Sequence, residues 1–261
     1  FLVGGILWLI LRRKVSFRRL FVFAALGYGT HGLIDACTSY GTYLLWPFSY
    51  VRIAWNNVAI IDPVFSVGVL LLLLVAFIRR NLRTARLALA FGLAWLLVGV
   101  VQRERAESVV RELAEGRGHL VERVVVKPSI FNNVLWRSTY LADGGIHADA
   151  IRLRLFGEPL LFEGGSVPLL DFDELEASCG KDSRAFRDVK RFTHFSDGFV
   201  ARKPGDPNVI GDFRYSLLPD GLDPVWGVRI NPDKPDGPIS FENFRKLDDA
   251  TWDRFLSMLF D

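Results

Sequence analysis

Two apolar stretches of 19 residues each, 20–38 and 60–78, constrain the fold of this chain more than any other feature. About 20 apolar residues cross the hydrocarbon core of a bilayer, so both are predicted to be transmembrane helices. Residues 84–102 predict a further span. Residues 1–11 are too short to cross alone, and we expect them to be the end of a truncated span. Residues 1–101 are therefore predicted to form an α-helical transmembrane bundle.

The charged residues divide the chain at the same place. Residues 1–101 carry ten Lys and Arg but only two acidic residues, Asp35 and Asp62, whereas residues 102–261 carry 22 basic and 27 acidic residues. A transmembrane bundle followed by a soluble α+β domain explains this division. The negative balance of the second part argues against nucleic-acid binding by the C-terminal domain.

Lys and Arg in the short loops predict the orientation of the chain in the membrane. Residues 12–19 hold five basic residues and residues 79–86 hold four, whereas the loop at 39–59 holds only Arg52. Since basic loops stay on the cytoplasmic side, the loop at 39–59 and the C-terminal domain are expected on the outer side. The lipid bilayer is thus the first predicted partner.

The second part of the chain has signals for both helices and strands. Residues 102–118 are predicted to be a helical stalk, which leaves 119–261 as the extracytoplasmic α+β domain. Asp248 or Asp249 is expected to cap the last helix. The further predicted elements are strands at 120–126, 134–142, 150–156, 212–218 and 225–231, and a helix at 183–195.

Three ionisable residues within the apolar region are the candidate site. His31 and Asp35 are four residues apart, so they share one face of a helix, and Asp62 lies near the start of the next span at the same membrane surface. One imidazole and two carboxylates suit a divalent cation, most readily zinc and alternatively manganese, which would activate water. The alternative is a packing network in which His31 is hydrogen-bonded to a carboxylate and Asp62 caps its own helix before Pro63.

Two other patterns in the membrane region have competing interpretations. Arg52 can hold an anionic substrate group beside the metal, or it can contact lipid headgroups. Gly27, Gly29 and Gly32 match a dinucleotide-binding pattern, but an acidic residue about 20 positions on is missing, so close helix packing explains them better.

The remaining histidines give no comparable pattern. His119, His147 and His194 are isolated along the sequence, and surface or structural roles are expected for them.

The segment HGLIDACTSYGTYLLWPFS at 31–49, followed by IIDP at 60–63, resembles the bacterial membrane-bound metal-dependent hydrolases, a family of inner-membrane proteins described as LexA-binding. The resemblance covers mainly residues 20–80, and residues 127–140 also resemble the family's domain after the membrane. It implies a metal site with His31, Asp35 and Asp62 as ligands in the bacterial inner membrane. A remoter similarity of the His-x-x-x-Asp helix to zinc-dependent phospholipases C implies phosphoester substrates. Family members usually have a histidine-containing stretch before the first span, and residues 1–261 do not include it, so we expect them to carry only part of the site if those histidines complete it.

Two functions follow as hypotheses. The first is an integral membrane metal-dependent hydrolase at the outer membrane face, with Asp35 and Arg52 as catalytic residues and a small-molecule or lipid-derived anionic substrate. The second is a membrane anchor without enzymatic activity that presents the outer α+β domain for binding.

Overall fold

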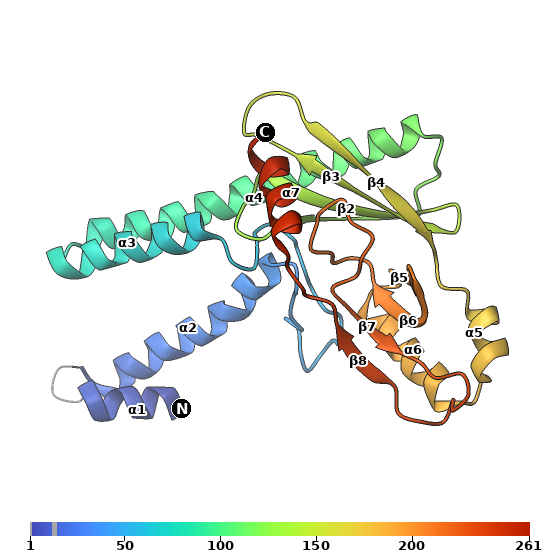
Figure 1. The fold of residues 1–261 in the computed structure, drawn as a ribbon. Helices are drawn as coiled ribbons and strands as arrows, with labels where there is room; N and C mark the ends of the chain where they lie inside the picture. The colour runs from blue at the N-terminus through green and yellow to red at the C-terminus, as the bar shows by residue number, and fades with distance from the viewer. Residues whose placement is uncertain (1, 12–14) are drawn as a thin grey trace. The chain divides into compact units, whose positions relative to one another are not determined.

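The structure is a computed structural model that describes residues 2–11 and 15–261 (Figure 1). Arg12, Arg13 and Lys14, three of the basic residues on which the predicted orientation depends, lie outside the described residues. The chain divides into two compact units, Phe1–Gly99 and Val100–Asp261. Unit 1 contains the helices α1 (Leu2–Leu11), α2 (Phe17–Cys37) and α3 (Pro63–Arg79) and the first part of α4 (Leu82–Gly116).

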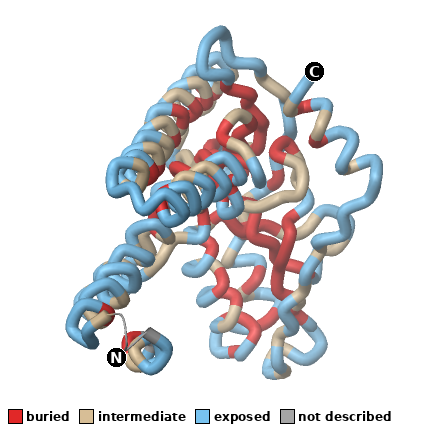
Figure 2. The backbone as a smooth tube through the Cα atoms, turned by 90° about the vertical axis from the view of Figure 1, so that its left-hand side faces the viewer, coloured by how far each residue is buried: buried red, intermediate tan, exposed pale blue. Residues whose placement is uncertain are grey.

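All four apolar stretches contain helices, but they differ in length. The helices α2 and α4, with 21 and 35 residues, are long and apolar enough to cross a membrane, and their apolar windows are mostly unburied in the structure (Figure 2). The stretch at 60–78 becomes helical only at Pro63, because Asp62 is the N-cap and Pro63 the first helical residue. The resulting helix of 17 residues is shorter than the usual span. A multi-pass arrangement therefore stays a prediction.

Glycines allow close packing of helices in unit 1, though not at the positions expected. A side chain at Gly68 of α3 would lie 2.4 Å from the Phe91 ring of α4, so only glycine fits there. Gly27 and Gly29 of α2 have nothing within 4 Å of the position that a side chain would take. The packing interpretation of these two glycines is therefore not supported. Their place inside a helix agrees with the rejection of a dinucleotide-binding turn.

Unit 2 contains two antiparallel sheets, each with its strands in sequence order. The first sheet consists of β1 (Arg123–Pro128), β2 (Leu135–Ala142), β3 (Gly145–Arg152) and β4 (Leu160–Pro168). The second consists of β5 (Val200–Lys203), β6 (Asp206–Asp212), β7 (Trp226–Arg229) and β8 (Ser240–Asn243). The helices of this unit after α4 are α5 (Phe172–Cys179), α6 (Arg184–Phe195) and α7 (Asp249–Phe260).

The strand predictions identified β1, β2 and β3 of the first sheet and β7 of the second, but not β4, β5 or β8. The expected hairpin turn forms at Asp143 and Gly144, both with positive φ, so the strand predicted at 150–156 already begins at Gly145. The strand predicted at 212–218 ends at Asp212. After Asp212 the chain turns instead of continuing as a strand. In this turn the Arg214 side chain donates hydrogen bonds to the Asp212 carboxylate.

The predicted stalk at 102–118 is helical but is not a free linker. Ala106, Val110 and Ala114, spaced one turn apart on α4, are completely buried and pack against Trp136 and Tyr140 of the first sheet. The second half of α4 therefore belongs to the core of unit 2. Buried positions concentrate in this unit (Figure 2).

The predicted helices of the C-terminal domain are confirmed, and their caps explain where they begin. The hydroxyl of Ser183 accepts from Phe186 N at the start of α6, and Asp248 accepts from Thr251 N at the start of α7. The face of α6 that carries Phe186, Val189 and Phe192 is buried in a cluster with the second sheet, as the periodicity predicts.

Candidate functional site

The loop between α2 and α3 folds back on the end of α2. Trp55 N donates to Ala36 O at 2.6 Å, and Asn57 N donates to Cys37 O at 2.8 Å, so the loop satisfies carbonyls that a helix end leaves open. Gly41, with φ of +67°, passes so close to the Ile53 carbonyl that a side chain would lie 2.5 Å from its oxygen. The loop therefore packs closely against the C-terminal end of α2.

His31 and Asp35 form a pair on α2, as their spacing predicts. His31 Nδ1 lies 3.0 Å from Asp35 Oδ2, and the two side chains are 70% and 46% exposed. A carboxylate at Nδ1 fixes the tautomer and the direction of the ring and leaves Nε2 to bind a ligand or a proton. Asp35 therefore occupies the position of a group that orients the imidazole.

Asp62 has a structural role in the same unit. Its side chain is 3% exposed. Oδ1 accepts from Phe65 N at 3.0 Å, which caps α3, and Oδ2 accepts from Trp95 Nε1 of α4 at 2.8 Å. The cap is the alternative that the sequence left open, whereas the bond to Trp95 was not predicted. One carboxylate oxygen thus caps α3, and the other joins the start of α3 to α4.

The predicted metal ligands fit a cation only in part. Within residues 2–11 and 15–261, no three His, Cys, Asp or Glu side chains come together in a group that could hold a metal ion. The structure brings His31 and Asp35 together and does not bring Asp62 to them. Imidazole nitrogen and carboxylate oxygen are suitable zinc donors, so the pair fits the chemistry of the ion while Asp62 does not fit the set.

Arg52 lies in the loop that covers the end of α2. It precedes Ile53, which forms an isolated antiparallel bridge with Thr42, and its side chain is half-buried. Its role toward an anionic substrate stays a prediction.

A second polar cluster, in unit 2, contains two histidines that we expected to be isolated. The rings of His119 and His147 lie 4.4 Å apart, and His119 Nδ1 is 3.0 Å from the hydroxyl of the buried Tyr140. Arg117 donates to the same hydroxyl and binds the buried Asp149 through both terminal nitrogens, at 2.8 and 2.9 Å. Burial first and the neighbouring His119 second lower the pKa of His147.

The pairing of Tyr140 with His147 is the one part of this cluster for which the sequence holds a signal. The turn at residues 143 and 144 fixes the register of its hairpin, which places Tyr140 opposite His147. The approach of His119 depends on how the end of α4 packs on the sheet, and no local sequence pattern encodes that contact.

The comparison with known proteins concerns unit 1 and the beginning of unit 2. Residues 1–106 match the family model described as YdjM inner membrane protein. No curated protein and no solved structure matches the chain. All four predicted site residues, His31, Asp35, Arg52 and Asp62, lie within the matched residues. The first 106 residues of this chain are thus similar to an inner-membrane protein family, in agreement with the apolar helices that they form.

Proposed function

We propose that this chain is an integral inner-membrane hydrolase whose central group is the His31 imidazole, with Asp35 as the residue that positions it. The observation that carries the proposal is the 3.0 Å contact between His31 Nδ1 and Asp35 Oδ2 on an apolar helix. Ionisable pairs are costly at membrane depth, and they are commonly found there where they serve a function.

In the proposal, the two side chains have separate tasks. Asp35 holds the proton of Nδ1 and thereby keeps Nε2 as the basic nitrogen, directed away from the carboxylate. Nε2 of His31 would be the nitrogen that holds a divalent cation, zinc or manganese, and such a cation would lower the pKa of a water molecule bound to it. Asp62 takes no part in this scheme, because both of its oxygens are engaged.

The substrate class in this proposal is a phosphoester, either a small molecule or lipid-derived, hydrolysed at the outer membrane face. Arg52 lies in the loop that covers the end of α2, and in the proposal its guanidinium binds the anionic group of the substrate. The family resemblance supports hydrolysis and the phosphoester class, and the basic loops support the orientation.

The test uses the full chain purified in detergent. Elemental analysis and hydrolysis of bis(p-nitrophenyl) phosphate are measured for the wild type, for His31→Ala and Asp35→Asn, and for the control His194→Ala at the end of α6. We expect stoichiometric metal and activity in the wild type and the control, loss of both in His31→Ala, and reduced activity in Asp35→Asn. Unchanged metal content and activity in both site variants would refute the proposal.

A second candidate function is a membrane anchor that presents unit 2 for binding. The observation in its favour is that unit 2 has extensive buried cores of its own, which is typical of a domain that can act apart from the helices. Under this alternative, a folded His31→Ala variant binds the partners of unit 2 as tightly as the wild type does.

A further inference from the structure

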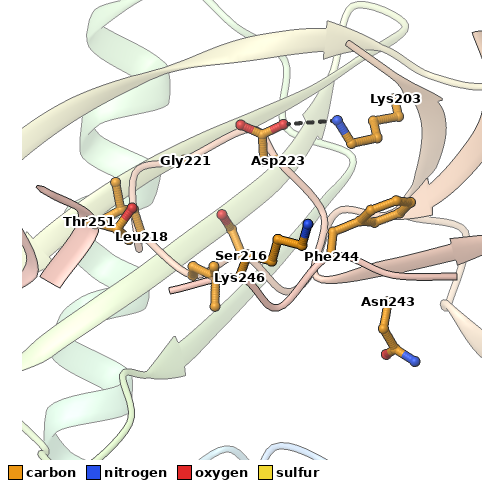
Figure 3. A pocket seen from close by; sticks show the side chains of 10 residues that line it. Lys203, Ser216, Leu218, Gly221, Asp223, Asn243, Phe244, Lys246 and Thr251 are labelled. Atoms are coloured by element: carbon orange, nitrogen blue, oxygen red, sulfur yellow. Dashed lines mark hydrogen bonds and ion pairs between the residues drawn. The ribbon is translucent and has the colours of Figure 1, made fainter. Parts of the chain in front are cut away.

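We propose that unit 2 binds a small organic anion, with a phosphate or carboxylate head and an apolar body, in a pocket of about 490 Å³. The pocket is bounded by β5, by residues 216–223, by the end of β8 with the residues that follow it, and by the first turn of α7 (Figure 3). Its volume lies within the range of small-molecule sites, about 300–1,000 Å³.

The charges of the pocket favour an anion. Its charged lining residues are Lys203, Lys246 and Asp223, so positive charge exceeds negative charge. The Lys203 ammonium lies 5.4 Å from the centre of the Phe244 ring and 3.3 Å from Asp223 Oδ1 (Figure 3). Asp223 is 81% exposed, so this ion pair is weak and a ligand anion can replace the carboxylate.

Lys246 provides a second ammonium with no competing partner. Among the residues that the structure describes, it forms no hydrogen bond and no ion pair. An anion that enters the pocket therefore gains one charge-assisted contact without breaking an existing one.

Neutral groups complete the pocket and define the rest of the ligand. Ser216 contributes a hydroxyl, and Gly221 keeps the space beside it open, because a side chain at Gly221 would lie 2.7 Å from Ser216 Oγ. Leu217, Leu218 and Phe244 provide apolar surface on which a hydrocarbon or aromatic body can pack. These groups distinguish an organic anion from a bare inorganic ion.

A buried arginine holds the wall of the pocket in place. Arg137 of β2 is 5% exposed and donates to the carbonyls of Pro219 and Gly221, each at 2.8 Å, and to that of Phe213 at 2.8 Å. Burial lowers the pKa of Arg137 to about 10, so the guanidinium is still charged at neutral pH. The loop that carries Ser216 and Gly221 is thus fixed before a ligand arrives, which reduces the entropic cost of binding.

The test measures binding of phenyl phosphate to the full chain in detergent by isothermal titration calorimetry. The variants are Lys203→Gln, Lys246→Gln and Gly221→Ala, and the matched control is Lys234→Gln, an exposed lysine outside the pocket. We expect Lys203→Gln and Lys246→Gln each to weaken binding by about tenfold or more, because each removes a charge-assisted contact. Gly221→Ala should weaken binding because its methyl group occupies the space beside Ser216 Oγ, and the control should leave binding unchanged. The titration is repeated in the His31→Ala variant, in which binding of phenyl phosphate as a substrate at the first site is removed. Binding that remains there and is lost with the pocket lysines belongs to this pocket, so its failure is separate from failure of the hydrolase proposal.

Competitors identify the source of the anion. Displacement of phenyl phosphate by phosphatidic acid added to the micelle supports a lipid headgroup, and displacement by glucose 6-phosphate supports a soluble ligand. Three results would overturn the proposal: no binding of phenyl phosphate, equal binding of phenol, or binding that survives the loss of both lysines.

Discussion

Replacing Asp62 tests whether this carboxylate joins two helices or holds a metal. In Asp62→Ala, α3 loses its N-cap, which costs about 0.5–2 kcal/mol. The Trp95 indole N–H also loses its acceptor, and leaving such a donor unsatisfied costs about 1–3 kcal/mol, with the lower end expected because Trp95 is only partly buried. The expected loss in the free energy of unfolding of unit 1 is therefore about 1.5–3 kcal/mol.

Two further variants separate the two bonds. Asp62→Ser keeps a capping oxygen but cannot reach Trp95, so it should lose about half as much stability as Asp62→Ala. Asn81→Ala is the matched control in the same unit, because Asn81 Oδ1 accepts from Arg83 N at the start of α4 and is exposed. Its loss should be about 1 kcal/mol.

The assay is denaturant unfolding in detergent micelles followed by circular dichroism, with metal content measured on the same samples. A loss in Asp62→Ala no larger than in Asn81→Ala would show that the Trp95 bond contributes nothing. Loss of metal from Asp62→Ala with an unchanged unfolding midpoint would refute the structural role and restore Asp62 as a ligand.

Three other predictions concern packing, pH and a buried charge. Gly68→Ala should destabilise unit 1 by about 1–3 kcal/mol, because the new methyl group meets an aromatic ring, whereas Gly29→Ala should be neutral or stabilising; thermal unfolding in detergent compares them. The pKa of His147 in the folded state is below the ordinary 6.5, so the unfolded state binds more protons near that pH. The free energy of unfolding should therefore fall as the pH drops below about 6.5. His147→Gln should weaken this pH dependence, as unfolding measured from about pH 7.5 to 5 can show. Asp212→Asn should cost about 3–5 kcal/mol, because it removes the buried one of the two carboxylates that pair with the buried Arg214 and leaves only the half-exposed Asp197. Asp206→Asn at the protein surface should cost much less, and urea titration can compare the two.

Helices were predictable from the sequence because their signals are local. The apolar stretches give the helical segments of unit 1, and cap residues such as Ser183 and Asp248 mark the starts of α6 and α7. The strand β4 was not predicted, and it contains two adjacent glycines, Gly164 and Gly165, which are unfavourable within a strand. A side chain at Gly164 would lie 2.1 Å from Ala148 O of the neighbouring strand, so glycine is required here for close approach within the sheet.

The candidate site was predictable only where its contacts are local. The spacing of His31 and Asp35 determines their contact, since residues four apart on a helix are neighbours. The partner of Asp62 is Trp95, 33 residues away on another helix, and no periodicity in the sequence encodes that bond. The anion pocket depends even more on tertiary structure, because its wall is held by an arginine from another sheet.

The two carboxylates of residues 1–101, Asp35 and Asp62, differ in how readily they could bind a ligand. Asp62 is buried, and its two oxygens accept hydrogen bonds from Phe65 N of α3 and from the Trp95 indole of α4, so a ligand that displaces either donor would cost the helix cap or the contact with α4. Asp35 is half exposed, and its contact with His31 leaves the outer ring nitrogen available. A group that takes part in chemistry must exchange partners without unfolding its surroundings, and only the pair on α2 meets this requirement. This difference is the reason to place the proposed chemistry at His31 and to regard Asp62 as part of the scaffold.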